Sequence, residues 1–151
     1  MEAPRAVVDY GLARRAVLTS LRGGGPTSRE DVCDAHPYLL RAARHHGEPT
    51  GRECPVCRRR PLTEVSYVYG DELGSCSGRV RTARELAEMA REHAEFRVYV
   101  VEVCAGEPAS GRGDLGQPGD RGGCGWNHLV QSYVLGDGVR RASSRRRTAN
   151  R

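Results

Sequence analysis

The chain has 151 residues, a formal net charge of +5 and a hydrophobic content of 38%. This length predicts a single domain, and no run approaches the roughly 20 apolar residues that span a membrane. Met1–Arg5 lacks the charged-then-apolar plan of a signal peptide. We therefore expect a cytoplasmic protein without a membrane partner.

The first part of the chain predicts three short helices. Apolar residues recur every three or four positions over Ala6–Leu21, which indicates a first helix that ends at the glycines before Pro26. Ser28 or Thr27 can cap a second helix over Arg29–Ala35. Pro37 opens a third over Tyr38–His46. Residues 5–47 are thus expected to form a helical unit.

Further along, the pattern changes to strands. The runs Thr63–Tyr69, Phe96–Val103 and Trp126–Leu135 are rich in β-branched and aromatic residues. Between the first two, Thr82-Ala83-Arg84-Glu85 is a capping box that opens a helix to about Glu95. The expected fold class is α+β, with the N-terminal helical unit packed on a three-stranded antiparallel zinc-ribbon-like sheet with one crossing helix.

The expected domain organisation follows from these patterns. Residues 1–138 form one compact domain, in which residues 52–138 are the zinc-ribbon-like unit. Within that unit, residues 106–123 are Gly-, Pro-, Asp- and Arg-rich and predict a flexible loop. Residues 139–151 predict a disordered Arg-rich tail. We expect a monomer.

Four cysteines have the spacing of metal ligands. Cys54-Pro55-Val56-Cys57 is a CxxC turn, whereas Cys104 ends one predicted strand and Cys124 precedes the next. In a reducing compartment such a set indicates structural Zn²⁺ before disulfides. A structural zinc contributes about 10–16 kcal/mol in small domains. A redox CxxC is disfavoured, because Pro61 follows too soon for the helix that such a motif opens.

Other candidate ligands have plainer explanations. Cys33 and His36 have CxxH spacing, but a buried Cys and a helix-capping His explain them as well. His128 could replace a cysteine ligand, and Cys76 lies in a Gly/Ser turn. A four-cysteine site is coordinatively closed, and no nucleophile elbow, phosphate loop or HExxH motif is present. We therefore expect no enzymatic activity.

The basic charge is concentrated at the C-terminus. The chain contains no Lys and no Ile, which is typical of a GC-rich genome and explains part of the Arg content. Residues 1–139 carry 18 Arg against 19 Asp and Glu, whereas residues 140–151 carry six Arg and no acid. Candidate nucleic-acid contacts are therefore the tail, with a second patch beside the CxxC turn: Arg58, Arg59, Arg60, Arg140, Arg141, Arg145, Arg146 and Arg147. A solvated surface explains each run equally well.

Several segments together resemble a family of small actinobacterial proteins of unknown function. They are Asp31–Ala43, Cys54–Cys57, Tyr67–Gly74, Phe96–Cys104 and Cys124–Leu129. In that family the last cysteine pair resembles an ordinary CxxC, so residues 107–122 look like an insertion here. The resemblance does not supply an activity for this chain.

The function expected from these features is a non-enzymatic zinc-ribbon adaptor. Its partner would be nucleic acid or a nucleoprotein machine such as RNA polymerase or the ribosome. The alternatives are a protein-binding regulator without nucleic-acid contact, and a thiol or zinc redox switch that uses Cys33, Cys76 or a labile zinc.

Overall fold

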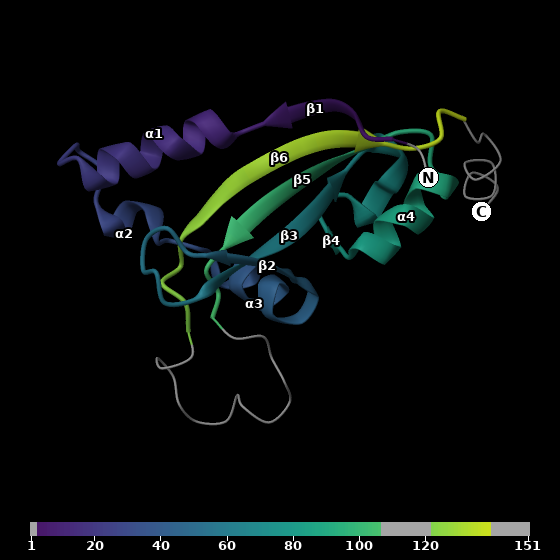
Figure 1. The fold of residues 1–151 in the computed structure, drawn as a ribbon. Helices are drawn as coiled ribbons and strands as arrows, with labels where there is room; N and C mark the ends of the chain where they lie inside the picture. The colour runs from purple at the N-terminus through teal and green to yellow at the C-terminus, as the bar shows by residue number, and fades with distance from the viewer. Residues whose placement is uncertain (1–2, 107–121, 140–151) are drawn as a thin grey trace.

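The computed structural model describes residues 3–106 and 122–139 (Figure 1). Six strands form one antiparallel sheet in the order β1-β6-β5-β3-β2, and β4 pairs with β3. The strands are β1 (Arg5–Asp9), β2 (Glu48–Glu53), β3 (Pro61–Tyr69), β4 (Val80–Arg81), β5 (Phe96–Val103) and β6 (Asn127–Leu135). The α+β class predicted from sequence is therefore confirmed.

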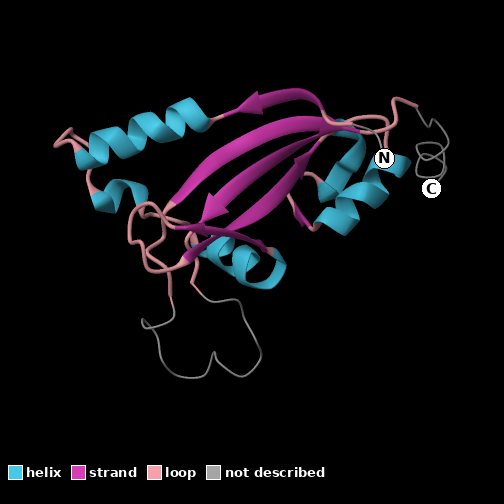
Figure 2. Ribbon diagram, viewed as in Figure 1, coloured by secondary structure: helices cyan, strands magenta, loops and turns pink. Residues whose placement is uncertain are grey.

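In the described part of the chain, four α-helices and one 3-10 helix pack around the sheet. They are α1 (Gly11–Arg22), α2 (Arg29–Val32), α3 (Pro37–His46), η1 (Asp71–Cys76) and α4 (Ala83–Glu92). Figure 2 shows α2, α3 and the cysteine-bearing loops at one end of the sheet and α4 at the other. The end that carries the loops is the end that positions the candidate site.

The caps explain where several helices begin. Thr82 and Glu85 form the predicted capping box at the start of α4. The ring of His36 accepts a hydrogen bond from the Tyr38 amide at 3.1 Å, so His36 is the N-cap of α3. Ser28 caps α2 through a capping box with Asp31.

The two faces of the sheet carry different helices. Val68, Val98 and Val100 point to one face, where they pack with Leu86 and Met89 of α4. Val65 and Val103 lie at alternate positions, so they point to the opposite face and pack with residues of α3.

The sheet has six strands rather than the predicted three. Strand β1 occupies the first residues of the predicted helix, which begins instead at Gly11. The β-branched Val7 and Val8 favour an extended backbone. Pairing of β1 with β6 also satisfies backbone groups on the edge of β6 that would otherwise face solvent. Strand β2 is polar and mostly exposed, so no hydrophobic alternation marked it in the sequence.

Some predictions lie outside the described residues. Most of the predicted loop at 106–123 and nearly all of the predicted tail at 139–151 belong to this group. The loop is described only at its ends, where Gly106 and Gly122 pair in an isolated bridge. Among the described residues, no helix has the length and apolar character needed to cross a bilayer.

Candidate metal centre

Two of the four predicted ligands come from the turn between β2 and β3. Cys54 is buried and Cys57 is half-buried. The Cys54 amide donates to the Arg60 carbonyl at 2.8 Å, and the Arg58 amide donates to the Cys54 carbonyl at 3.1 Å. Arg58 has φ of 56°, a left-handed conformation that a side chain disfavours. These bonds fold the turn so that both sulfurs point to the same side.

The other two ligands come from β5 and the segment before β6. The Cys124 amide donates to Cys104 Sγ at 3.3 Å, just as the Val56 amide donates to Cys54 Sγ at 3.4 Å. The Gly125 amide donates to the Cys104 carbonyl at 3.1 Å. Cys104 and Cys124 therefore form a turn-like pair, although many residues separate them in the chain.

Glycine is required at two positions of this second pair. A Cβ on Gly123 would lie 2.0 Å from the Cys104 carbonyl oxygen. Gly125 has φ of 90°, and a Cβ there would lie 2.9 Å from the carbonyl oxygen of Cys33. The close approach of the backbone around Cys124 depends on both residues.

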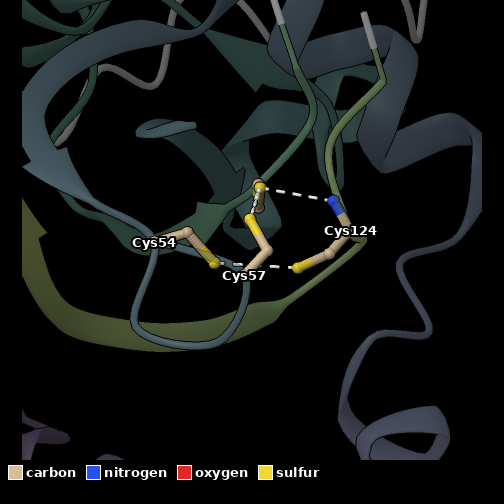
Figure 3. A group of neighbouring side chains, drawn as sticks. Cys54, Cys57 and Cys124 are labelled. Carbon is tan, nitrogen blue, oxygen red and sulfur yellow. Dashed lines mark hydrogen bonds between the residues drawn. The ribbon is translucent and has the colours of Figure 1, made fainter. Parts of the chain in front are cut away.

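The four sulfurs form one cluster (Figure 3). All four lie within 4.8 Å of one another, with Cys54 and Cys124 at 3.6 Å and Cys57 and Cys104 at 3.7 Å. A tetrahedral ion with metal–sulfur bonds of about 2.3 Å requires sulfur separations of about 3.8 Å. The donor set thus fits a tetrahedral metal ion.

The electrostatics of the metal-free cluster reflect the crowding of the thiols. A hydrogen bond with Cys104 lowers the pKa of Cys54 to about 5. The same bond and burial raise the pKa of Cys104, and burial raises the pKa of Cys124 to about 12. Hydrogen bonds from neighbouring thiols therefore favour the thiolate form of Cys54, and a bound cation would favour the thiolate form of all four cysteines.

An apolar shell surrounds the centre. Leu18 of α1, Leu62 of β3 and Trp126 are buried with Cys54 and Cys104 in one cluster. Such a shell limits the access of water to metal-bound sulfur. Arg22 of α1 also donates to the Pro55 carbonyl at 2.9 Å, which fastens the helix to the first turn.

Cys33 lies at the edge of the centre, beside Cys124, although the sequence favoured a buried cysteine apart from the metal ligands. It follows α2, and its Sγ lies 3.6 Å from Cys124 Sγ. It lies outside the group of four whose sulfurs are mutually close. The amide of Ala35 donates to the Gly125 carbonyl at 3.1 Å, which holds this segment in place.

The other residues weighed in the sequence lie elsewhere. His128 stacks on Trp126 with ring centroids 5.9 Å apart. Cys76 packs against the α4 core. His36, as the cap of α3, has the role that the plainer explanation gave it. None of these three belongs to the four-residue cluster found among the described residues.

A buried carboxylate that sequence reasoning missed lies near the centre. Glu102 is fully buried and accepts hydrogen bonds from Trp126 Nε1 at 2.7 Å, Arg14 Nε at 2.8 Å and Arg52 at 3.3 Å. Arg52, Glu102 and Trp126 each lie two residues from a cysteine of the cluster. The network therefore links the segments that carry the ligands. The sequence offered no signal for this network beyond the presence of a charged residue at a buried position of β5.

Of the predicted nucleic-acid contacts, only the three beside the first turn lie within the described residues. Arg58 and Arg59 are exposed, whereas Arg60 is half-buried. Arg140, Arg141, Arg145, Arg146 and Arg147 lie outside the described residues.

Comparison with known proteins identifies the family. Residues 1–108 match the family described as "Family of unknown function (DUF5318)". The chain belongs to this family. The matched segment includes Cys54, Cys57 and Cys104 and ends before Cys124. This match, with the mycobacterial relatives described next, confirms the resemblance to a family of small actinobacterial proteins of unknown function.

Two relatives of this DUF5318 chain are mycobacterial. They are "Uncharacterized protein Rv0049" of Mycobacterium tuberculosis and "Uncharacterized protein Mb0050" of Mycobacterium bovis. Each is 47% identical over 129 residues, which is 85% of this chain and 81% of the relative. No solved structure matches.

Proposed function

We propose that this protein is a non-enzymatic adaptor in which Cys54, Cys57, Cys104 and Cys124 hold one structural Zn²⁺ and basic residues contact nucleic-acid phosphates. The observation that carries the proposal is the cluster of four sulfurs, whose spacing fits a tetrahedral ion. Four thiolates fill the coordination of zinc and leave no position for water or substrate. This arrangement supports a structural role and a zinc-ribbon-like pairing of two cysteine turns.

The sulfur spacing favours a single ion such as zinc over an iron–sulfur cluster, which needs room for sulfide between the cysteines. Here the sulfurs are 3.6 Å and 3.7 Å apart in pairs, which leaves space for a single ion.

Metal analysis of the purified protein tests the zinc assignment. We expect one zinc and no iron per chain. Cys104→Ser or Cys124→Ser should lose the zinc, because serine does not replace a thiolate ligand at neutral pH. Cys76→Ser is the matched control and should retain it. Full zinc content and stability in Cys104→Ser would contradict the four-cysteine site.

The nucleic-acid part of the proposal rests on charge. The exposed Arg58 and Arg59 lie on the first cysteine turn, and residues 140–151 supply six Arg without an acid. Phosphate contacts release counterions, so affinity falls steeply with salt. About six contacts give a log–log slope near −4 on single strands. Titration of the full-length protein with a fluorescent oligonucleotide between low and physiological salt measures this slope. An absence of binding at low salt would refute the adaptor.

One alternative also has an observation in its favour. The 3.6 Å separation of the Cys33 and Cys124 sulfurs supports a thiol or zinc redox switch. Counting accessible thiols with and without oxidant distinguishes this alternative from the adaptor. A purely protein-binding regulator would show no salt-dependent binding to nucleic acid.

A further inference from the structure

A fifth cysteine lies beside the proposed zinc centre. Cys33 Sγ is 3.6 Å from Cys124 Sγ, which is as close as Cys124 comes to Cys54, another of the proposed ligands. Cys33 lies outside the group of four sulfurs, and four thiolates fill the coordination of a zinc ion without it. Cys33 is therefore a thiol that lies against the centre but has no place on the metal.

The backbone holds the two segments that carry these sulfurs together. The amide of Ala35 donates to the Gly125 carbonyl at 3.1 Å. The side chain of Asn127 donates to the same carbonyl and to Asp34, each at 3.1 Å. Gly125 also allows a close approach, because a Cβ there would lie 2.9 Å from the Cys33 carbonyl oxygen. The segment that follows α2 is thus fastened to the segment that precedes β6.

Local structure also fixes the position of Cys33 itself. Its amide donates to the Arg29 carbonyl at 2.9 Å at the end of α2, and the capping box of Ser28 and Asp31 fixes the start of this short helix. A disulfide joins its sulfurs at about 2 Å. Closure from 3.6 Å is a small movement that rotation of the two side chains can supply.

These two sulfurs are among the accessible ones of the cluster. Cys33 and Cys124 are half-buried, whereas Cys54 and Cys104 are fully buried. Cys57 is half-buried as well, but the sulfur close to it, at 3.7 Å, is that of the ligand Cys104. A small oxidant reaches accessible thiols before buried ones. It therefore meets a ligand and a thiol off the metal at the same place.

We propose that Cys33 and Cys124 form a disulfide when a hydroperoxide reaches the centre, and that this bond removes Cys124 from the metal. The inference deepens the proposed function and rests on its zinc, because it assigns a means of regulation to that site. Thiol oxidation, given above as an alternative function, then acts as a control on the adaptor's own metal site.

The atoms and electrons of this reaction balance. One sulfur attacks a peroxide oxygen, the O–O bond breaks, and hydroxide leaves while that sulfur becomes a sulfenic acid. The other sulfur attacks the sulfenic acid, the S–O bond breaks, and a second hydroxide leaves as the S–S bond forms. Two electrons pass from the cysteines to the peroxide. The hydroxides take one proton from the Cys33 thiol and one from solvent, so two waters form.

The test follows zinc release from the full-length protein in hydrogen peroxide, with a colorimetric zinc chelator as the readout. The wild type should release its zinc, because three thiolates remain for the ion, and dithiothreitol with added zinc should restore it. Cys33→Ser should retain zinc as purified. It should release the metal roughly tenfold more slowly, since no neighbouring thiol then resolves the sulfenic acid.

Cys76→Ser is the matched control. Cys76 is a half-buried cysteine that packs against the α4 core, so its loss should leave the rate of zinc release unchanged. Circular dichroism identifies any variant that fails to fold.

Peptide mapping of the wild type identifies the bond without any substitution. Cleavage after arginine places Cys33, Cys104 and Cys124 on separate peptides. Mass spectrometry after alkylation of the free thiols then reports which cysteines are joined. We expect the Cys33–Cys124 linkage to accumulate in step with zinc release.

The outcomes separate this inference from the zinc site. Reduced wild-type protein that holds no zinc overturns both. Protein that holds zinc but joins other cysteines, or that releases zinc equally fast without Cys33, overturns the switch and leaves the structural zinc standing. A folded Cys33→Ser that lacks zinc before any oxidant is added would make Cys33 a ligand and overturn the switch as well.

Discussion

Removal of the Glu102 carboxylate tests whether the buried network holds the ligand-bearing segments together. Glu102→Ala deletes the acceptor shared by Trp126, Arg14 and Arg52. The change leaves all four cysteines intact. A loss of stability would therefore report on the support of the centre rather than on its ligands.

The expected magnitude follows from the three bonds. The Trp126 indole N–H would remain inside the protein without its acceptor, which costs about 1–3 kcal/mol. The charged bond from Arg14, whose side chain is 27% exposed, adds about 1.5–3 kcal/mol. Arg52 is 48% exposed and also pairs with Glu64 at 2.7 Å, so it adds little. We expect a total of about 3–5 kcal/mol, as for other buried pairs that lose one partner.

The single tryptophan provides the assay. Trp126 is fully buried beside the centre and is the sole Trp in the chain. Its fluorescence during urea unfolding of the zinc-loaded protein measures the free energy, and a thermal scan should show a midpoint lower by roughly 10 °C. Glu102→Gln, which keeps an acceptor for Trp126, should lose less.

Glu64→Ala is the matched control. Glu64 is 31% exposed on the neighbouring strand and pairs with Arg52, so its removal should cost less than about 1 kcal/mol. If Glu102→Ala destabilises the protein no more than Glu64→Ala does, the network does not support the centre as argued.

Two further predictions concern the segments at either side of β6. Replacing residues 107–121 with a short glycine linker should leave zinc content and melting temperature unchanged. The reason is that Gly106 and Gly122 already pair and that closure entropy grows only slowly with loop length. A large fall in melting temperature would contradict this prediction. Truncation after Val139 removes six Arg, so the salt slope of oligonucleotide binding should flatten from about −4 toward zero. An unchanged slope would move the phosphate contacts to Arg58 and Arg59.

The sequence predicted best where local patterns are strong. Phe96–Val103 was predicted with the bounds that β5 has, because the segment is rich in valine and aromatic residues, which favour strands. The capping box at Thr82 located the start of α4 correctly. The four cysteines were identified from type and spacing alone, and the structure brings their sulfurs together.

What escaped prediction depends on tertiary contacts. β1 overlaps a segment whose apolar spacing suits a helix, and only pairing with β6 makes it a strand. β2 has no apolar face and exists because β3 lies beside it. The approach of Cys33 to Cys124 follows from the docking of α2, which no spacing in the chain encodes.

The two edges of the sheet have a consequence for self-association. At one edge, β2 contains Pro49, which has no amide hydrogen, and three charged side chains; both features discourage a second chain from adding a strand. At the other edge, β1 pairs with β6 between Gln131 and Val134. A chain that lacked its first nine residues would leave this stretch of the β6 backbone open to a second chain. The short N-terminal strand therefore protects this edge of the sheet from pairing with a second chain.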